Sequence, residues 1–302
     1  MLFLFQPSRM QKPFLRLTVA AILSAACASA RLPAPSSSEP QTSSSTTENQ
    51  IRGLPARSWH FKFRDETHSY ASVTQTTIQS INNLPSSIDT FTTRSHFSIT
   101  VDRQQTPSVI SGEVTQMEIV PGQRVHNKLP IASAFAFTGS ITSGQVLLHL
   151  SPVPADTALC NNPAASYLSE LHAGVLSLPS QIQTGSSWSD TLSTTTCSGN
   201  RLPFIAQTIR LYQVQGITQE ANLQLLLIKR TEQIRLSGAG SQDQHQIKVR
   251  GTGSGSADLF LNSETGTLQA AQVSQSLDFT LLTSGKSYQF RQATTQRIDF
   301  VR

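Results

Sequence analysis

Residues 272–281 have the sequence QVSQSLDFTL, and Val273, Leu277, Phe279 and Leu281 lie on one side of its two-residue repeat. A period of two is typical of a β-strand with one buried face and one hydrated face. The pattern extends over some 13 residues. At roughly 3.3 Å per residue, such a strand exceeds about 40 Å and indicates a large curved sheet.

The same alternation recurs along the chain, in a set of runs whose apolar members are Trp59, Phe61 and Phe63; Phe97, Ile99 and Val101; Phe135 and Phe137; and Val146, Leu148 and Leu150. Residues 223–228 are apolar on both faces and predict a fully buried strand. Glycine, asparagine and proline pairs between the runs predict short hairpins. We therefore expect a mostly β fold with eleven or twelve antiparallel strands, as one large curved sheet or two related β half-barrels.

One short helix is predicted inside residues 161–180. Asn162 can cap it and Pro163 suits its first turn, whereas Gly174 lies near its end. Its apolar face would consist of Tyr167, Leu168, Leu171 and Val175. The segment would connect a first β half, residues 53–160, to a second, residues 181–302.

A tryptophan stands near the start of each predicted half, Trp59 in the first and Trp188 in the second. This repetition is compatible with an internal duplication. It is equally compatible with two tryptophans that close the ends of a single core. Both interpretations remain open at this stage.

Residues 12–27, KPFLRLTVAAILSAAC, are typical of an export signal. Arg9, Lys12 and Arg16 provide the basic flank, and residues 17–26 form an apolar stretch that is well below the roughly 20 residues of a membrane span. We therefore predict a signal peptide over residues 1–26.

The four residues from Ser24 to Cys27 resemble the lipobox of bacterial lipoproteins. The resemblance implies that Cys27 becomes the lipid-bearing first residue of the mature chain, although Ser24 stands where that family prefers an aliphatic residue. Residues 28–30, ASA, form an alternative site for ordinary signal cleavage and simple secretion. Residues 27–52 are rich in Ser, Thr and Pro and predict a disordered tether.

The expected location is the cell envelope, with the chain anchored to a membrane by its lipid. In the resembling family an aspartate after the cysteine retains a lipoprotein at the inner membrane, and Ala28 and Ser29 lack it. That implies the outer membrane in a cell with two membranes. Without the lipid, the protein would be periplasmic or secreted.

Charge and composition argue against a nucleic-acid partner. The whole chain has a net charge of +5, but Arg9, Lys12 and Arg16 belong to the signal, so 20 basic and 18 acidic residues remain after it. These basic residues are scattered along the chain, whereas nucleic-acid binding requires a basic patch.

Two cysteines, Cys160 and Cys197, remain in the predicted folded part. Export exposes them to an oxidising compartment, so we expect a disulfide between them. A loop of this length would stabilise the fold by roughly 4 kcal/mol in the chain-entropy model. The alternative, a metal or redox site, lacks close cysteine spacing and nearby histidines.

The candidate chemical groups have simpler explanations. Asp65, Glu66 and His68 fall at a predicted hairpin tip, where polar residues are expected for hydration. Glu170 and His172 are two residues apart on the predicted helix and point to different faces. Residues 251–255, GTGSG, lack the lysine and helix of a phosphate loop and favour a bulge or close backbone packing. We expect no catalytic residues, metal or cofactor, and hence no enzyme.

Two resemblances extend this interpretation. Residues 178–190, with Leu178-Pro179 and GSSWSD, together with residues 258–268, resemble uncharacterised exported bacterial β-rich proteins, which imply no activity. The long strands with one interposed helix are also similar, in architecture alone, to the half-barrels of periplasmic lipoprotein carriers and to lipid-binding lipoproteins.

The function predicted from these observations is that of a non-enzymatic envelope protein that binds a lipid or other hydrophobic ligand on a concave sheet face. The candidate ligand-binding residues are Phe97, Ile99, Phe135, Phe137, Val273, Leu277 and Phe279. The same side chains would also serve as ordinary core. Two further hypotheses are a structural or protein-interaction scaffold of the envelope and a closed transmembrane barrel, because alternation alone does not distinguish inside from outside.

Overall fold

A computed structural model describes residues 57–82, 88–121, 134–142, 144–152, 163–198, 202–220, 223–242 and 245–301. The predicted signal peptide, Cys27 and the tether lie outside the described residues. Cys160 and the side chain of Cys197 lie outside them too, so the disulfide stays a prediction.

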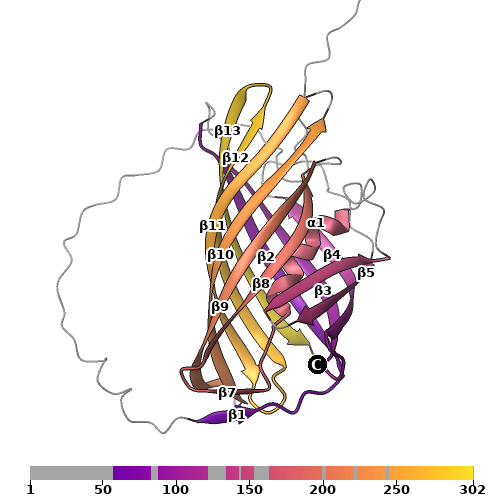
Figure 1. Ribbon diagram of the computed structural model, residues 1–302, viewed down its shortest axis with the longest axis vertical. Coiled ribbons are helices and arrows are strands. Elements are labelled where there is room, and N and C mark those ends of the chain that lie inside the picture. Colours follow the sequence, from indigo (N-terminus) through magenta and orange to yellow (C-terminus); the bar gives the residue numbers. More distant parts are fainter. Residues whose placement is uncertain are drawn as a thin grey trace, which may run out of the picture.

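Eleven strands form a closed barrel (Figure 1). They are β2 (Thr67–Ser80), β3 (Ile88–Asp102), β4 (Ser108–Pro121), β5 (Phe135–Thr142), β6 (Gln145–Ser151), β8 (Ser187–Ser198), β9 (Leu202–Glu220), β10 (Leu223–Gln242), β11 (His245–Asn262), β12 (Leu268–Thr283) and β13 (Lys286–Val301). Neighbouring strands are antiparallel except β6 and β8, which run parallel over three residue pairs.

The mostly β prediction is confirmed, but the sheet is neither open nor divided into half-barrels. β13 pairs with β2 along the register from Phe290↔Ser80 to Val301↔Ser69, which closes the ring. Strands from both predicted halves belong to this one sheet. Long strands twist strongly, and register shifts at Phe97, Ile228 and Leu261 add local bends, so the sheet coils far enough to meet its own edge.

Two short strands, β1 (Ser58–His60) and β7 (Gln181–Gln183), form a separate antiparallel pair below the barrel in Figure 1. The strand predicted through Phe63 ends at His60. The backbone N–H of Phe61 still donates to Ser180, next to β7, whereas that of Lys62 donates to Glu264, so the chain leaves β7 at this point. Buried side chains of this end include Trp59, Phe61, Leu178 and Ile182. They cap the lower end of the barrel.

The helical segment consists of two elements instead of the one predicted. Helix α1 (Pro163–Leu171) is followed by a 3₁₀ turn, η2 (His172–Gly174). Tyr167 is hydrogen-bonded to Ser95 of β3, and Nε2 of Gln296 on β13 donates to the carbonyl of Glu170 at 2.9 Å. Strands β13 and β3 flank β2 on one side of the ring, and α1 also packs against β6 and β8 on the other side, so the helix lies inside the barrel (Figure 1).

The helix and the lower strands form the larger of two apolar clusters. Leu171 of α1, Phe137 of β5 and Leu259 of β11 are completely buried in it. A smaller cluster occupies the other half of the lumen, with Ile78, Phe204, Leu236, Ile247, Val249, Leu281 and Phe290 as its buried members.

Among the described residues, no helix has the length and hydrophobicity that a membrane span needs.

The outer face of β10 to β13 is mostly polar, with Leu282 and Val301 as large exposed apolar exceptions. The outward positions of β10 and β11 alternate with buried ones and carry, among others, the exposed side chains of Lys229, Arg235, Lys248 and Arg250. A transmembrane barrel places apolar side chains at such positions. These strands therefore present a hydrated outer face.

Three glycines of β11 face the lumen in a regular ladder. A Cβ at Gly251 would lie 2.7 Å from Cβ of Phe279, and one at Gly253 would lie 2.3 Å from the carbonyl oxygen of Ser276. A Cβ at Gly255 would lie 2.8 Å from Oε2 of Glu232. The strand pairing has no register shift here, so the prediction of close backbone packing is confirmed and a bulge is excluded at these residues.

We expect Gly253→Ala to destabilise the barrel by about 1 to 3 kcal/mol, because the new methyl group must displace the backbone of β12. The free energy of unfolding from urea titration measures this effect. Ser254→Ala, on the outward face of the same strand, is the matched control and should change stability by less than about 0.5 kcal/mol. Equal effects of the two substitutions would contradict the assignment of the inner face.

Candidate functional site

The lumen contains a buried ion pair between Asp190 of β8 and Arg210 of β9. Nε of Arg210 lies 2.6 Å from Oδ1 of Asp190, and Nη2 lies 2.8 Å from Oδ2. The two side chains are 1% and 0% exposed, so the pair is fully removed from solvent. This bidentate geometry is the strongest form of an arginine–carboxylate contact.

Arg210 also binds the end of the helical segment. Its Nη1 donates to the carbonyl oxygens of His172 at 3.0 Å and Val175 at 3.3 Å. The carbonyl of His172 also accepts from the backbone N–H of Val175 at 3.2 Å, and carbonyls at a helix end favour a cation nearby. Arg210 therefore fastens the helix to the barrel wall, with its charge balanced by Asp190.

Two aromatic side chains pack beside this pair. Trp188 of β8 stacks on Tyr212 of β9, with ring centroids 5.0 Å apart. The hydroxyl of Tyr212 donates to Oδ2 of Asp190 at 3.1 Å. Burial raises the pKa of Tyr212 to about 12, so the phenol keeps its proton and remains a donor.

A second buried ion pair lies on β10. Nε of Arg230 is 2.7 Å from Oε1 of Glu232, and both side chains are 2% exposed. Despite this short distance, neither Nε nor Nη1 of Arg230 makes a hydrogen bond among the described residues. Gln275 of β12 donates to the other oxygen of Glu232 at 2.6 Å. We define the polar belt as Asp190, Arg210, Arg230, Glu232 and Gln275.

Replacement of Arg210 by methionine should destabilise the protein by about 3 to 5 kcal/mol, because it leaves the Asp190 carboxylate buried without its cation. Urea denaturation followed by circular dichroism measures the loss. Arg291→Met is the matched control, since Arg291 pairs with Asp278 at 2.8 Å but is 58% exposed, and its loss should cost far less stability than the loss of Arg210. Similar losses for both variants would contradict a structural role for the buried pair.

Glu170 of α1 is the one acidic group of the helix. Its Oε2 is buried and makes no hydrogen bond among the described residues. Burial raises the pKa of Glu170 to about 7, and the nearby Thr74 hydroxyl lowers it in part. The carboxyl is therefore protonated in mildly acidic solution and becomes charged near neutral pH.

This raised pKa predicts a loss of stability as the pH rises. Between the ordinary glutamate value of 4.5 and about 7 the folded chain binds more protons at Glu170 than the unfolded chain does. The protonated carboxyl of Glu170 stabilises the folded chain fully below pH 4.5. This stabilisation, on the order of 3 kcal/mol, is lost as the pH rises through 7. Glu170→Gln should flatten this fall when the unfolding free energies at pH 5 and pH 7.5 are compared. An unchanged pH dependence would contradict the burial of the carboxyl.

The structure divides the predicted ligand-binding residues into two groups. Phe97, Ile99, Phe137 and Val273 are at most 6% exposed and belong to the lower cluster. Phe135 is partly buried and meets Tyr167 of α1 edge-on, with centroids 6.1 Å apart. These five side chains contribute to the lower core, much of which packs against the helical segment.

The other two, Leu277 and Phe279, lie on the inner face of β12 in the upper half of the barrel. Phe279 stacks on Phe290 at 5.2 Å. Both remain partly exposed, as do three further residues packed against the upper cluster. We define the upper lumen by these inward-facing, partly exposed side chains: Phe91, Ala206, Leu277, Phe279 and Tyr288. Water can therefore reach part of this apolar wall.

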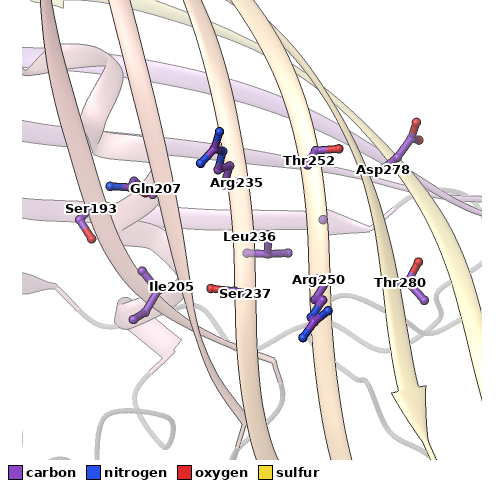
Figure 2. Close-up of a pocket in the computed structure, with 11 residues that line it drawn as sticks. Ser193, Ile205, Gln207, Arg235, Leu236, Ser237, Arg250, Thr252, Asp278 and Thr280 are labelled. Carbon is purple, nitrogen blue, oxygen red and sulfur yellow. The ribbon is translucent and has the colours of Figure 1, made fainter. Parts of the chain in front are cut away.

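A groove with a volume of about 690 Å³ lies on the outer face of the barrel (Figure 2). Outward side chains from β8 to β12 line it, including Gln207, Arg235, Ser237, Arg250, Thr252 and Asp278. Sequence reasoning missed this groove. Alternation could have assigned each residue to an outer face, but their proximity depends on the pairing of strands far apart in sequence.

Asp65, Glu66 and His68 do not form a common site. Asp65 accepts a hydrogen bond from Gln104 at 2.6 Å, and Glu66 pairs with Arg64 at 3.4 Å. His68 instead lies beside Phe300, with ring centroids 5.9 Å apart. A search of the described residues finds no group of histidine, cysteine and acidic side chains that could hold a metal ion.

Comparison of the sequence with models of known protein families and with curated proteins finds no match in either set.

Proposed function

We propose that the protein is a non-enzymatic, exported envelope protein that holds a hydrophobic ligand in the upper lumen of its barrel. The export signal and a lipid on Cys27 would keep it at a membrane, in the outer membrane of a two-membrane cell. The observation that carries the proposal is the partial exposure of inward-facing apolar side chains within a closed barrel.

The contrast between the two halves of the barrel supports this location of the ligand. In the lower half, α1 fills the space between the strands, and residues such as Phe137 and Leu171 are inaccessible. In the upper half, Leu277 and Phe279 keep accessible surface although their strand, β12, is paired on both sides. Covering that surface with acyl chain would yield about 25 cal/mol per Å².

The polar belt supports a ligand that has a polar end. Gln275 belongs to the belt and precedes Leu277 on the inner face of β12, with its side chain bonded to Glu232. An apolar chain against Leu277 and Phe279 would therefore meet amide and carboxylate groups at one end. This arrangement suits an amphipathic lipid better than a hydrocarbon without a head group.

A second candidate is an interaction scaffold, and one observation favours it. Three outward aliphatic side chains lie on β9, with Gln207 between the first two: Ile205, Ile209 and Leu211, with exposures of 50%, 43% and 52%. Exposed apolar stripes of this kind are common at protein contacts. In that case the upper lumen would be empty of lipid in the purified protein.

Leu277→Trp should weaken binding of a fluorescent fatty acid by at least about tenfold, because the indole occupies upper-lumen space that the ligand needs. Fluorescence titration gives the affinity, and native mass spectrometry of the purified mature protein shows co-purified lipid and the mass of the acylated amino terminus.

Leu282→Trp provides the control, since Leu282 lies on the outer face of the same strand and is 42% exposed. It should bind the probe like the original chain. The ligand proposal fails if no lipid co-purifies and the probe does not bind, or if both tryptophan variants bind it equally well.

A further inference from the structure

The outer groove on β8 to β12 has a net positive charge in the part of the chain that the structure describes. Asp278, its acidic residue, is bound by Arg291, with N–O distances of 2.8 and 3.2 Å. Arg235 and Arg250 also line the groove, and neither forms an ion pair or side-chain hydrogen bond among the described residues. Two guanidinium groups are therefore available to an anion.

The strand register brings these two arginines together. Arg235 of β10 is opposite Thr252 of β11, and Arg250 precedes Thr252 by two residues on the same outer face. Diagonal neighbours of this kind have backbones about 7 to 8 Å apart. Like charges at this separation repel each other, and an anion placed between them would remove the repulsion.

The remaining lining residues define the type of anion. Ser193, Ser237, Thr252 and Thr280 offer hydroxyl groups and Gln207 offers an amide, which suit a ligand with many hydroxyls. Ile205 and Leu236 are the apolar side chains of the lining. The lining runs over five adjacent strands, about 19 Å at about 4.8 Å per step, so an extended molecule fits it better than a single small anion.

Two other classes of extended ligand fit less well. A peptide that binds a sheet by adding a strand needs a free edge, and β9 to β12, which form most of the groove, are paired on both sides. Single-stranded nucleic acid binds through aromatic side chains on which its bases stack, and the groove lining contains no aromatic residue among those described.

From this geometry we propose that the outer groove binds an acidic oligosaccharide, with its carboxylate or sulfate groups on Arg235 and Arg250 (Figure 2). The site is separate from the upper lumen, because its polar side chains project from the opposite face of the same strands. Failure of the saccharide proposal would leave the lipid proposal intact.

Isothermal titration of the full mature chain tests the proposal with four probes: an oligogalacturonate, a heparin oligosaccharide, a neutral maltooligosaccharide and an oligothymidylate of similar charge. The first two distinguish carboxylate from sulfate as the recognised group, and binding of at least one of them is expected. Arg235→Gln combined with Arg250→Gln should weaken that binding by at least about tenfold, since both charge-assisted contacts are lost.

Lys229→Gln is the matched control, because Lys229 lies on the outer face of the same strand as Arg235 but outside the groove lining. It removes one positive charge and should leave the affinity within about twofold. Thr252→Trp would block the groove without a change of charge and should also abolish binding. Circular dichroism confirms that each variant is folded.

The proposal is overturned if neither acidic saccharide binds, if the neutral saccharide binds equally well, or if Lys229→Gln weakens binding as much as the double substitution. Equal affinity for the oligothymidylate would also overturn it, because the groove would then attract any polyanion.

Discussion

The width of an eleven-strand barrel is the constraint on which the rest of this structure depends. A barrel of about eight strands is just filled by its own inward side chains, whereas a wider one encloses additional space. Here the lower half of that space is occupied by α1 and η2. The upper half contains a smaller apolar cluster whose flanking side chains keep some accessible surface.

Placing a helix inside a barrel brings polar backbone into an apolar interior. The carbonyl of Val175 would be costly there without a donor, and Arg210 supplies one while giving the carbonyl of His172 a second donor beside the backbone N–H of Val175. A buried guanidinium in turn needs a carboxylate, which Asp190 provides from the adjacent strand. The burial of the helix therefore requires Arg210, and the burial of Arg210 requires Asp190. The buried carboxyl of Glu170 is a further destabilising consequence of placing the helix in the lumen.

The inner and outer faces of the same strands support two independent proposals. On β12, Leu277 and Phe279 face the upper lumen, whereas Asp278 and Thr280 line the outer groove. On β12 the two environments are separated by the sheet itself, since β12 is paired with β11 and β13 along its length. One strand can therefore present an apolar surface to a lipid and a polar surface to a hydrated ligand.

The local patterns in the sequence were informative wherever a contact involves neighbours along the chain. Alternation identified the long strands and assigned Val273 and Phe279 to an inner face, and the residues around Pro163 and Gly174 marked the helical segment. Of the two explanations for the glycines of residues 251–255, a bulge or close backbone packing, close packing was correct. The same patterns did not predict closure, because period-two alternation is identical in an open and a closed sheet.

The sequence by itself determined which segments become strands and which side of each strand avoids water, because both follow from the spacing of apolar residues. Tertiary structure alone decided that β13 meets β2, that the helix enters the lumen, and that Arg210 meets Asp190. It also assembled Arg235 and Arg250 into one groove. These arrangements depend on strand register and on the total curvature of the sheet, which are summed over the whole barrel and are encoded in no single segment.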